Sequence, residues 1–116
     1  AAKIRKEEAR IDWSRSAAEI DRQVRAFVPW PVAETRLGDE QVRIWEACPV
    51  TKETAVKSHA APGTVVQAAD GRIVVATANG LLELLTVQFP GRKPLKARDI
   101  LNSRPLAGER FGEVFA

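Results

Sequence analysis

The sequence predicts a mainly β domain: a small, partly open five-stranded barrel with an amphipathic helix before it and a short helix after it. Three observations lead to this prediction. A helical spacing of apolar residues ends at Pro29, and an alternating spacing follows Pro31. Two dipeptides typical of tight hairpin turns, Asp70-Gly71 and Asn79-Gly80, then divide the alternating region. The change from helical to alternating spacing therefore sets the fold class.

The first predicted helix begins at a capping box formed by Ser16 and Glu19. In such a box the serine oxygen accepts a hydrogen bond from the amide three residues on, and the glutamate reaches back to the cap. Apolar residues between positions 17 and 27 then recur at spacings of three and four, which places them on one helical face. Pro29 and Pro31 are expected to end the helix.

Five short antiparallel strands are predicted after this helix. They are Val32–Leu37 and Gln41–Val50, joined by a turn at Gly38-Asp39, then Gly63–Ala69 and Arg72–Ala78, joined at Asp70-Gly71, and finally Leu81–Phe89, reached through Asn79-Gly80. Strands this short protect their edges best by curling into a barrel, with the amphipathic helix over one open end. The predicted architecture is therefore a helix followed by an OB-like barrel.

Composition bounds the domain organisation. The chain has 116 residues, of which 45% are hydrophobic and 28% charged, which fits one globular domain with one modest core. We assign residues 1–13 to an interdomain linker or arm and residues 14–116 to the domain. No stretch approaches the roughly 18 apolar residues that a membrane helix needs, so no membrane association is expected. The single Cys48 fits a reducing compartment, which predicts a cytoplasmic protein, and we expect a monomer.

The sequence contains no methionine, even at position 1. No targeting segment is visible either. We therefore expect the chain to be a fragment of a longer protein, and its function to be part of a larger one.

Catalytic signals are close to absent. His59 is the only histidine, and no acidic residue is placed by sequence to orient it. No pair of cysteines or histidines has metal-ligand spacing, and no glycine-rich phosphate loop follows a strand. Cys48 is predicted to be a core side chain on the side of Val42 and Ile44 rather than a nucleophile. The sequence thus predicts no catalytic residue, metal or cofactor in this domain.

The aromatic residues favour packing over base stacking. Trp13 and Trp30 flank the predicted helix, and only Trp45 and Phe89 lie on predicted strands. Proteins that bind single strands stack several bases on sheet aromatics. We therefore expect all three tryptophans to be packing residues.

Positive charge is concentrated in one segment near the end of the chain. Between residues 92 and 104 five cations stand against Asp99, a local balance of 5 − 1 = +4 in a chain whose net charge is +3. These cations are Arg92, Lys93, Lys96, Arg98 and Arg104. A turn at Pro90-Gly91 and a predicted short helix over residues 97–103 fix the shape of the segment. A solvated face is the ordinary explanation of a basic stretch, but this fixed shape favours a phosphate-rich partner. Whether Arg43 and Arg72 extend the patch stays open.

Several blocks of the sequence form a familiar pattern. They are Lys3-Ile4, Ile11-Asp12-Trp13, Ser16-Ala17-Ala18-Glu19-Ile20, Arg25-Ala26-Phe27, Pro29-Trp30-Pro31, Pro62-Gly63-Thr64 and Leu85 through Arg104, with Gln88, Gly91-Arg92-Lys93 and Leu101-Asn102-Ser103-Arg104. With these residues the chain resembles the C-terminal domain of the methionyl-tRNA formyltransferases over essentially its whole length. The first blocks are shared with other formyltransferase-like enzymes, and the last block is the specific one.

The resemblance implies a two-domain parent enzyme. Its N-terminal domain would bind formyl-tetrahydrofolate and transfer the formyl group to initiator methionyl-tRNA, a step of translation initiation. The family's catalytic Asn, His and Asp belong to that domain, and no residue of this sequence matches them. The C-terminal domain would clamp the tRNA beside its own N-terminal catalytic domain. Arg92, Lys93 and Arg104 fall on basic positions of the family pattern, whereas Lys96 and Arg98 are included on electrostatic grounds.

Two alternatives stay open at this point. The chain could be the companion domain of a related folate-dependent hydrolase or sugar-nucleotide formyltransferase, where it would shape a small-molecule cleft. It could also be a structural module whose basic loop pairs with acidic residues of its own catalytic domain. The excess of cations between residues 92 and 104 speaks against the small-molecule alternative.

Overall fold

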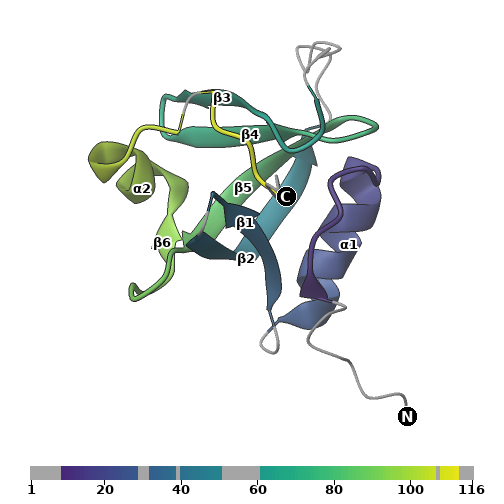
Figure 1. The fold of residues 1–116 in the computed structure, drawn as a ribbon, viewed down its shortest axis with the longest axis horizontal. Coiled ribbons are helices and arrows are strands. Elements are labelled where there is room, and N and C mark those ends of the chain that lie inside the picture. Colours follow the sequence, from purple (N-terminus) through teal and green to yellow (C-terminus); the bar gives the residue numbers. More distant parts are fainter. Residues whose placement is uncertain (1–8, 29–31, 39, 51–60, 107, 113–116) are drawn as a thin grey trace.

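The computed structural model describes residues 9–28, 32–38, 40–50, 61–106 and 108–112. Its elements are α1 (Ala17–Phe27), β1 (Ala33–Leu37), β2 (Glu40–Val50), β3 (Val65–Ala69), β4 (Arg72–Ala76), β5 (Leu81–Gln88), β6 (Leu95–Lys96) and α2 (Ala97–Ser103). The strands curl around one core, with α1 and α2 on opposite sides (Figure 1). The predicted mainly β fold with a small, partly open barrel is confirmed. Among the described residues, no helix has the length and apolar character needed to cross a membrane.

Helix α1 begins at the predicted capping box. The Ser16 hydroxyl oxygen accepts a hydrogen bond from the Glu19 amide at 3.2 Å, and the Glu19 carboxylate accepts one from the Ser16 amide at 3.3 Å. Ala17, Ile20 and Val24 form the buried face and join the same core as the sheet residues. The helix packs chiefly against β2. The predicted stop at Pro29 and Pro31, with Trp30 between them, lies outside the described residues.

The strands form one antiparallel sheet in the order β1-β2-β5-β4-β3, and β6 pairs with β5 outside this path. The three predicted hairpin pairings, β1 with β2, β3 with β4 and β4 with β5, are all confirmed. At the turn between β3 and β4, Asp70 and Gly71 have φ angles of 56° and 74°. Two successive positive φ angles are what the tight turn of a twisted hairpin requires.

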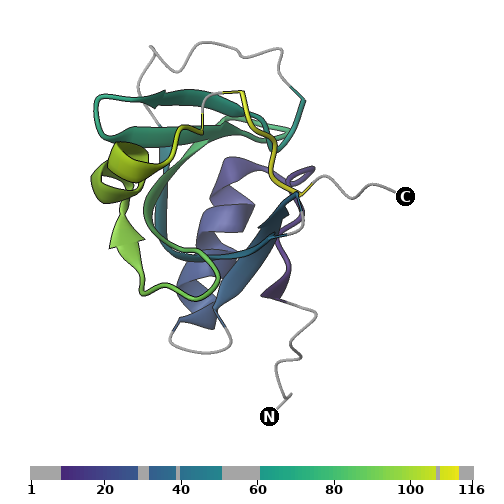
Figure 2. The ribbon, with the colours of Figure 1, turned by 60° about the vertical axis from the view of Figure 1, so that its left-hand side comes forward.

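The segment at residues 108–112 links the two outer strands of the sheet. The Phe111 amide donates to the Gly63 carbonyl just before β3, and the Gly112 amide donates to the Arg36 carbonyl in β1, both at 2.7 Å. Figure 2 shows this last, yellow part of the chain passing along the open side of the barrel. We call residues 108–112 the seam. It covers backbone groups at both sheet edges that would otherwise lack partners.

Trp13 fastens the start of the described chain to the seam. Its indole nitrogen donates to the Thr35 hydroxyl at 2.9 Å, and its ring stacks on Phe111 with 6.0 Å between centroids. Ala9 and Ile11 are buried as well. Residues 9–13, which the sequence assigned to the linker or arm, therefore pack into the domain.

Cys48 is half-buried and lies outside the core cluster, so its predicted core position is wrong. Strand β2 has register shifts between Ile44 and Glu46 and between Glu46 and Ala47. Ala47 therefore packs against the core, while Cys48 pairs with Glu83. Burial, and then the nearby charge of Glu83, raises the pKa of the Cys48 thiol. A thiol with a raised pKa is protonated at neutral pH and is a poor nucleophile.

Gly63→Ala is expected to destabilise the domain more than Gly38→Ala. Both glycines have positive φ, +93° and +62°, so both substitutions carry the backbone cost of a side chain in this region. A Cβ at position 63 would lie 2.3 Å from the Phe111 carbonyl oxygen, whereas a Cβ at position 38 meets nothing within 4 Å. We expect an additional loss of about 1–3 kcal/mol in the free energy of unfolding, measured by urea denaturation. Equal losses of unfolding free energy in the two variants would show that the seam moves away from the added methyl group without a loss of stability.

Candidate nucleic-acid interface

The basic segment is attached to the barrel along its length. It starts with a turn in which the Arg92 amide donates to the Phe89 carbonyl at 3.1 Å. Residues 95–96 then pair back onto β5 as β6, a strand too short to show an alternating pattern in the sequence. Helix α2 follows over the predicted residues and buries Ala97 and Ile100. The cations are therefore presented on a fixed scaffold rather than on a free tail.

Three of the five predicted cations are both exposed and without an ion-pair partner among the described residues. Arg92 and Lys93 lie on the turn, and Arg98 lies in the first turn of α2. Within the described part of the chain, none of the three forms an ion pair. They are the charges most available to an external anion.

The other two cations are paired with carboxylates of β2. Lys96 Nζ lies 3.1 Å from Glu46 Oε1, and the Arg104 guanidinium donates to the Glu40 carboxylate. Hydrogen bonds, first from Thr86 and then from Lys96, lower the pKa of Glu46. The hydrogen bond with Arg104 lowers the pKa of Glu40. Both carboxylates are therefore ionised at neutral pH and offset part of the positive charge.

Arg72 and Arg43, which the sequence left open, differ from each other. Arg72 binds the Glu83 carboxylate through two nitrogens, Nε at 3.2 Å and Nη2 at 2.9 Å. It therefore adds no free charge to the patch. Arg43 is half-buried on β2, opposite Gln88 of β5. It forms no ion pair with any residue that the structure describes.

Four of the five cations border two hollows. The larger has a volume of about 480 Å³ and is lined by Lys96 and Arg98, and the smaller has a volume of about 220 Å³ and is lined by Arg92 and Arg104. Lys93 lines neither of these two. The cations that form one patch in the sequence are therefore divided between two hollows and the turn in the structure.

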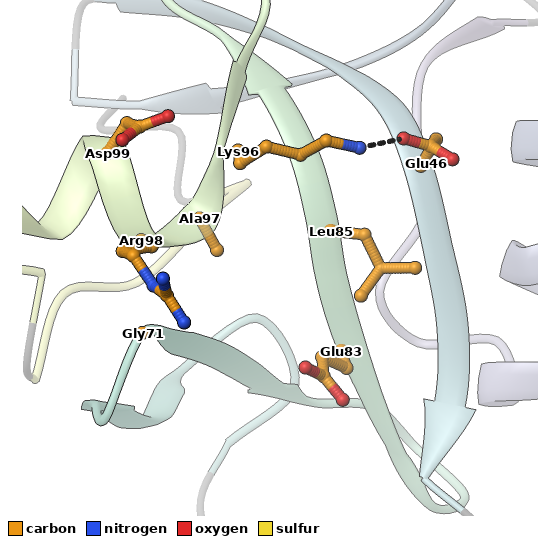
Figure 3. A pocket seen from close by; sticks show the side chains of 8 residues that line it. All are labelled: Glu46, Gly71, Glu83, Leu85, Lys96, Ala97, Arg98 and Asp99. Atoms are coloured by element: carbon orange, nitrogen blue, oxygen red, sulfur yellow. Dashed lines mark hydrogen bonds and ion pairs between the residues drawn. The ribbon is translucent and has the colours of Figure 1, made fainter.

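The larger hollow carries charge of both signs. Figure 3 shows the Lys96 side chain reaching across β5 to Glu46, and the Arg98 side chain extending toward Gly71. A Cβ on Gly71 would lie 3.4 Å from the Arg98 Cβ and 3.5 Å from its Nε, so the glycine leaves room for this arginine. No group of acidic, histidine or cysteine side chains that could hold a metal ion is present among the described residues, which do not include His59.

Two residues that the sequence did not assign to the site hold the basic turn. The Trp45 indole nitrogen donates to Gln88 Oε1 at 2.9 Å, and Gln88 Nε2 donates to the Arg92 carbonyl at 2.8 Å. The packing predicted for Trp13 is confirmed, whereas Trp45 is half-buried and lies outside the core cluster. Trp45 and Gln88 are 43 residues apart, so no local signal in the sequence links them.

Comparison with known proteins agrees with this fold. The family model described as formyl transferase, C-terminal domain, matches residues 3–105. A crystal structure of a HypX variant from Aquifex aeolicus is similar with a TM-score of 0.67 and 20% identity, over 87% of this chain and 18% of that chain. The structure of HypX from Aquifex aeolicus in complex with tetrahydrofolic acid is similar with a TM-score of 0.66 and 20% identity, over 85% of this chain and 17% of that one.

This chain thus spans less than a fifth of the HypX chains, and at 20% identity the likeness shows the fold alone. The family model covers nearly the whole chain. The chain belongs to the family of formyl transferase C-terminal domains.

Proposed function

We propose that this chain is the non-catalytic C-terminal domain of a methionyl-tRNA formyltransferase of the cytoplasm. In this proposal it binds initiator methionyl-tRNA and positions it for N-formylation by the catalytic domain of the same protein. The observation that carries the proposal is the set of exposed cations Arg92, Lys93 and Arg98, which form no ion pair with any described residue and are held by a turn and a helix that are fixed to β5. Formyl-tetrahydrofolate, the formyl donor, is assigned to the catalytic domain and to no residue described here.

Contact with phosphates suits this arrangement better than reading of bases. Folded RNA is recognised largely by shape and by its phosphates and 2′-hydroxyls. Arginine binds a phosphate through two parallel hydrogen bonds, and lysine acts as a compact point charge. The exposed cations supply both kinds of contact, while the ring of Trp45 is half-buried and Trp13 is buried. We therefore expect binding that tolerates changes of RNA sequence.

The domain would contribute to formylation through binding energy. Contacts far from the reacting amino group can hold the acceptor end of the tRNA in place for the reaction. The barrel is suited to this task because the same strand, β5, carries core residues and the basic turn. A rigid attachment transmits the position of the bound RNA to the rest of the protein.

A second candidate function rests on the likeness to HypX. One of the similar structures contains tetrahydrofolic acid, and the volume of the larger hollow lies within the range of small-molecule sites. The domain would then belong to a formyl transferase that acts on a small molecule. In that case the turn at Arg92 and Lys93 would have no role in RNA binding.

The double variant Arg92→Ala/Lys93→Ala is expected to weaken tRNA binding. Each lost phosphate contact lowers the slope of log affinity against log salt by about one, so we expect the slope to fall by about two. Fluorescence titration of labelled initiator tRNA at several salt concentrations measures this slope.

The matched control is Arg15→Ala/Arg22→Ala. It removes the same charge from exposed residues near the start and in the middle of α1, on the other side of the barrel (Figure 1). The control should keep the salt slope of the unchanged protein. The same slope in both double variants would overturn the tRNA proposal and favour the small-molecule candidate.

Arg98→Ala should reduce tRNA affinity more than Arg72→Ala. The two arginines lie on neighbouring elements, but Arg72 is neutralised by Glu83 and Arg98 is unpaired among the described residues. We expect Arg98→Ala to lower the salt slope by about one and Arg72→Ala to leave it unchanged. The same titration measures both variants. A larger effect of Arg72→Ala would show that ion pairing does not decide which cations bind RNA.

A further inference from the structure

The Arg104 guanidinium is held in place without its carboxylate partner. Its Cζ atom lies 4.5 Å from the centroid of the Phe89 ring, and that ring is buried in the core. The Arg104 amide donates to the Ile100 carbonyl at 2.9 Å, which fixes the backbone at the end of α2. The planar group therefore stays at the border of the smaller hollow whether or not Glu40 contacts it.

Arg92 is held on another side of the same hollow. Its amide and carbonyl are both hydrogen-bonded, the first to Phe89 and the second to the Gln88 side chain. Trp45 orients that Gln88 side chain through its indole nitrogen. The backbone of Arg92 is thus fixed relative to Phe89, the residue on which Arg104 stacks. The hollow of about 220 Å³ is lined by an arginine from each of two separate segments.

Glu40 is the carboxylate that lines this hollow. It contacts Arg104, and the side chains of the pair are 41% and 38% exposed. Exposed ion pairs contribute little to stability, because water and salt screen them. Another anion that offers two oxygens to Arg104 and a third contact to Arg92 can therefore replace Glu40.

We propose that the hollow between Arg92 and Arg104 is a phosphate site, and that the Glu40 carboxylate is a resident counter-ion that a phosphodiester displaces. This inference rests on the proposed function for the source of the phosphate, which is the RNA backbone. The site itself requires only a phosphate group. Ser103 also lines the hollow, and its hydroxyl becomes an available donor once it leaves the Ile100 carbonyl.

Titration with inorganic phosphate tests the site directly. The Nε–H signals of Arg92 and Arg104 are followed by NMR in the whole chain, at constant ionic strength kept with sodium chloride. We expect both signals to shift together with one dissociation constant. Glu40→Gln should raise the phosphate affinity about fivefold, which corresponds to about 1 kcal/mol, because it removes the competing charge.

Glu19→Gln is the matched control for this substitution. It makes the same change of charge on α1, and glutamine preserves a capping box. Arg104→Lys is a second test, because lysine keeps the charge and loses the planar, two-pronged contact. We expect it to lower the phosphate affinity about tenfold. Equal phosphate affinities in the Glu40→Gln and Glu19→Gln proteins, or a shift of only one arginine signal, would overturn the site.

A parallel titration with initiator tRNA separates this inference from the proposed function. Tighter phosphate binding by Glu40→Gln together with no salt-dependent tRNA binding would support the site and overturn the tRNA function. Salt-dependent tRNA binding that is weakened by Arg92→Ala/Lys93→Ala, together with phosphate affinities that are equal in Glu40→Gln and Glu19→Gln, would support the function and overturn the site.

Discussion

The fold and the candidate interface both depend on the pairing of β5. This strand hydrogen-bonds with β2, β4 and β6, while its inward residues Leu82, Leu84 and Val87 are each no more than 2% exposed. Its last residue, Gln88, donates a hydrogen bond to the basic turn, and the guanidinium of Arg104 stacks on the ring of the next residue, Phe89. A shift of register by one residue would turn the apolar residues outward and move the basic turn with them. The core and the charged surface are therefore set by the same hydrogen bonds.

Local signals in the sequence predicted both helices and strands β1 to β5, but not the long-range contacts that form the seam and β6. The capping box at Ser16 and the turn at Asp70-Gly71 depend on neighbouring residues, so a sequence shows them directly. The seam depends on Phe111 reaching Gly63, and β6 forms only because β5 is already in place. The register shifts in β2 moved Cys48 out of the core, since one extra residue reverses an alternating pattern.

Charge was the strongest signal of function in the sequence. It was incomplete because contacts between distant residues leave no local signal. A sequence gives the number of cations but does not show which carboxylates fold back onto them. Lys96 meets a glutamate 50 residues away, and Arg104 meets one 64 residues away. Three of the five cations form no ion pair within the described part of the chain, and they are divided between the turn and α2. The structure thus replaces a uniform basic loop with a smaller set of charges in defined positions.

The paired carboxylates have a consequence for selectivity. A basic surface without internal counter-ions attracts any polyanion, because its attraction needs no particular arrangement of charge. Where a carboxylate must first be displaced, a single phosphate gains little from binding. A ligand that places one phosphate between Arg104 and Arg92 and another at Lys93 recovers that loss through several contacts at once. A rigid, folded RNA presents phosphates at fixed separations, whereas a flexible chain must lose entropy to do so. Glu40 and Glu46 would therefore weaken binding of small or disordered anions more than binding of a folded RNA.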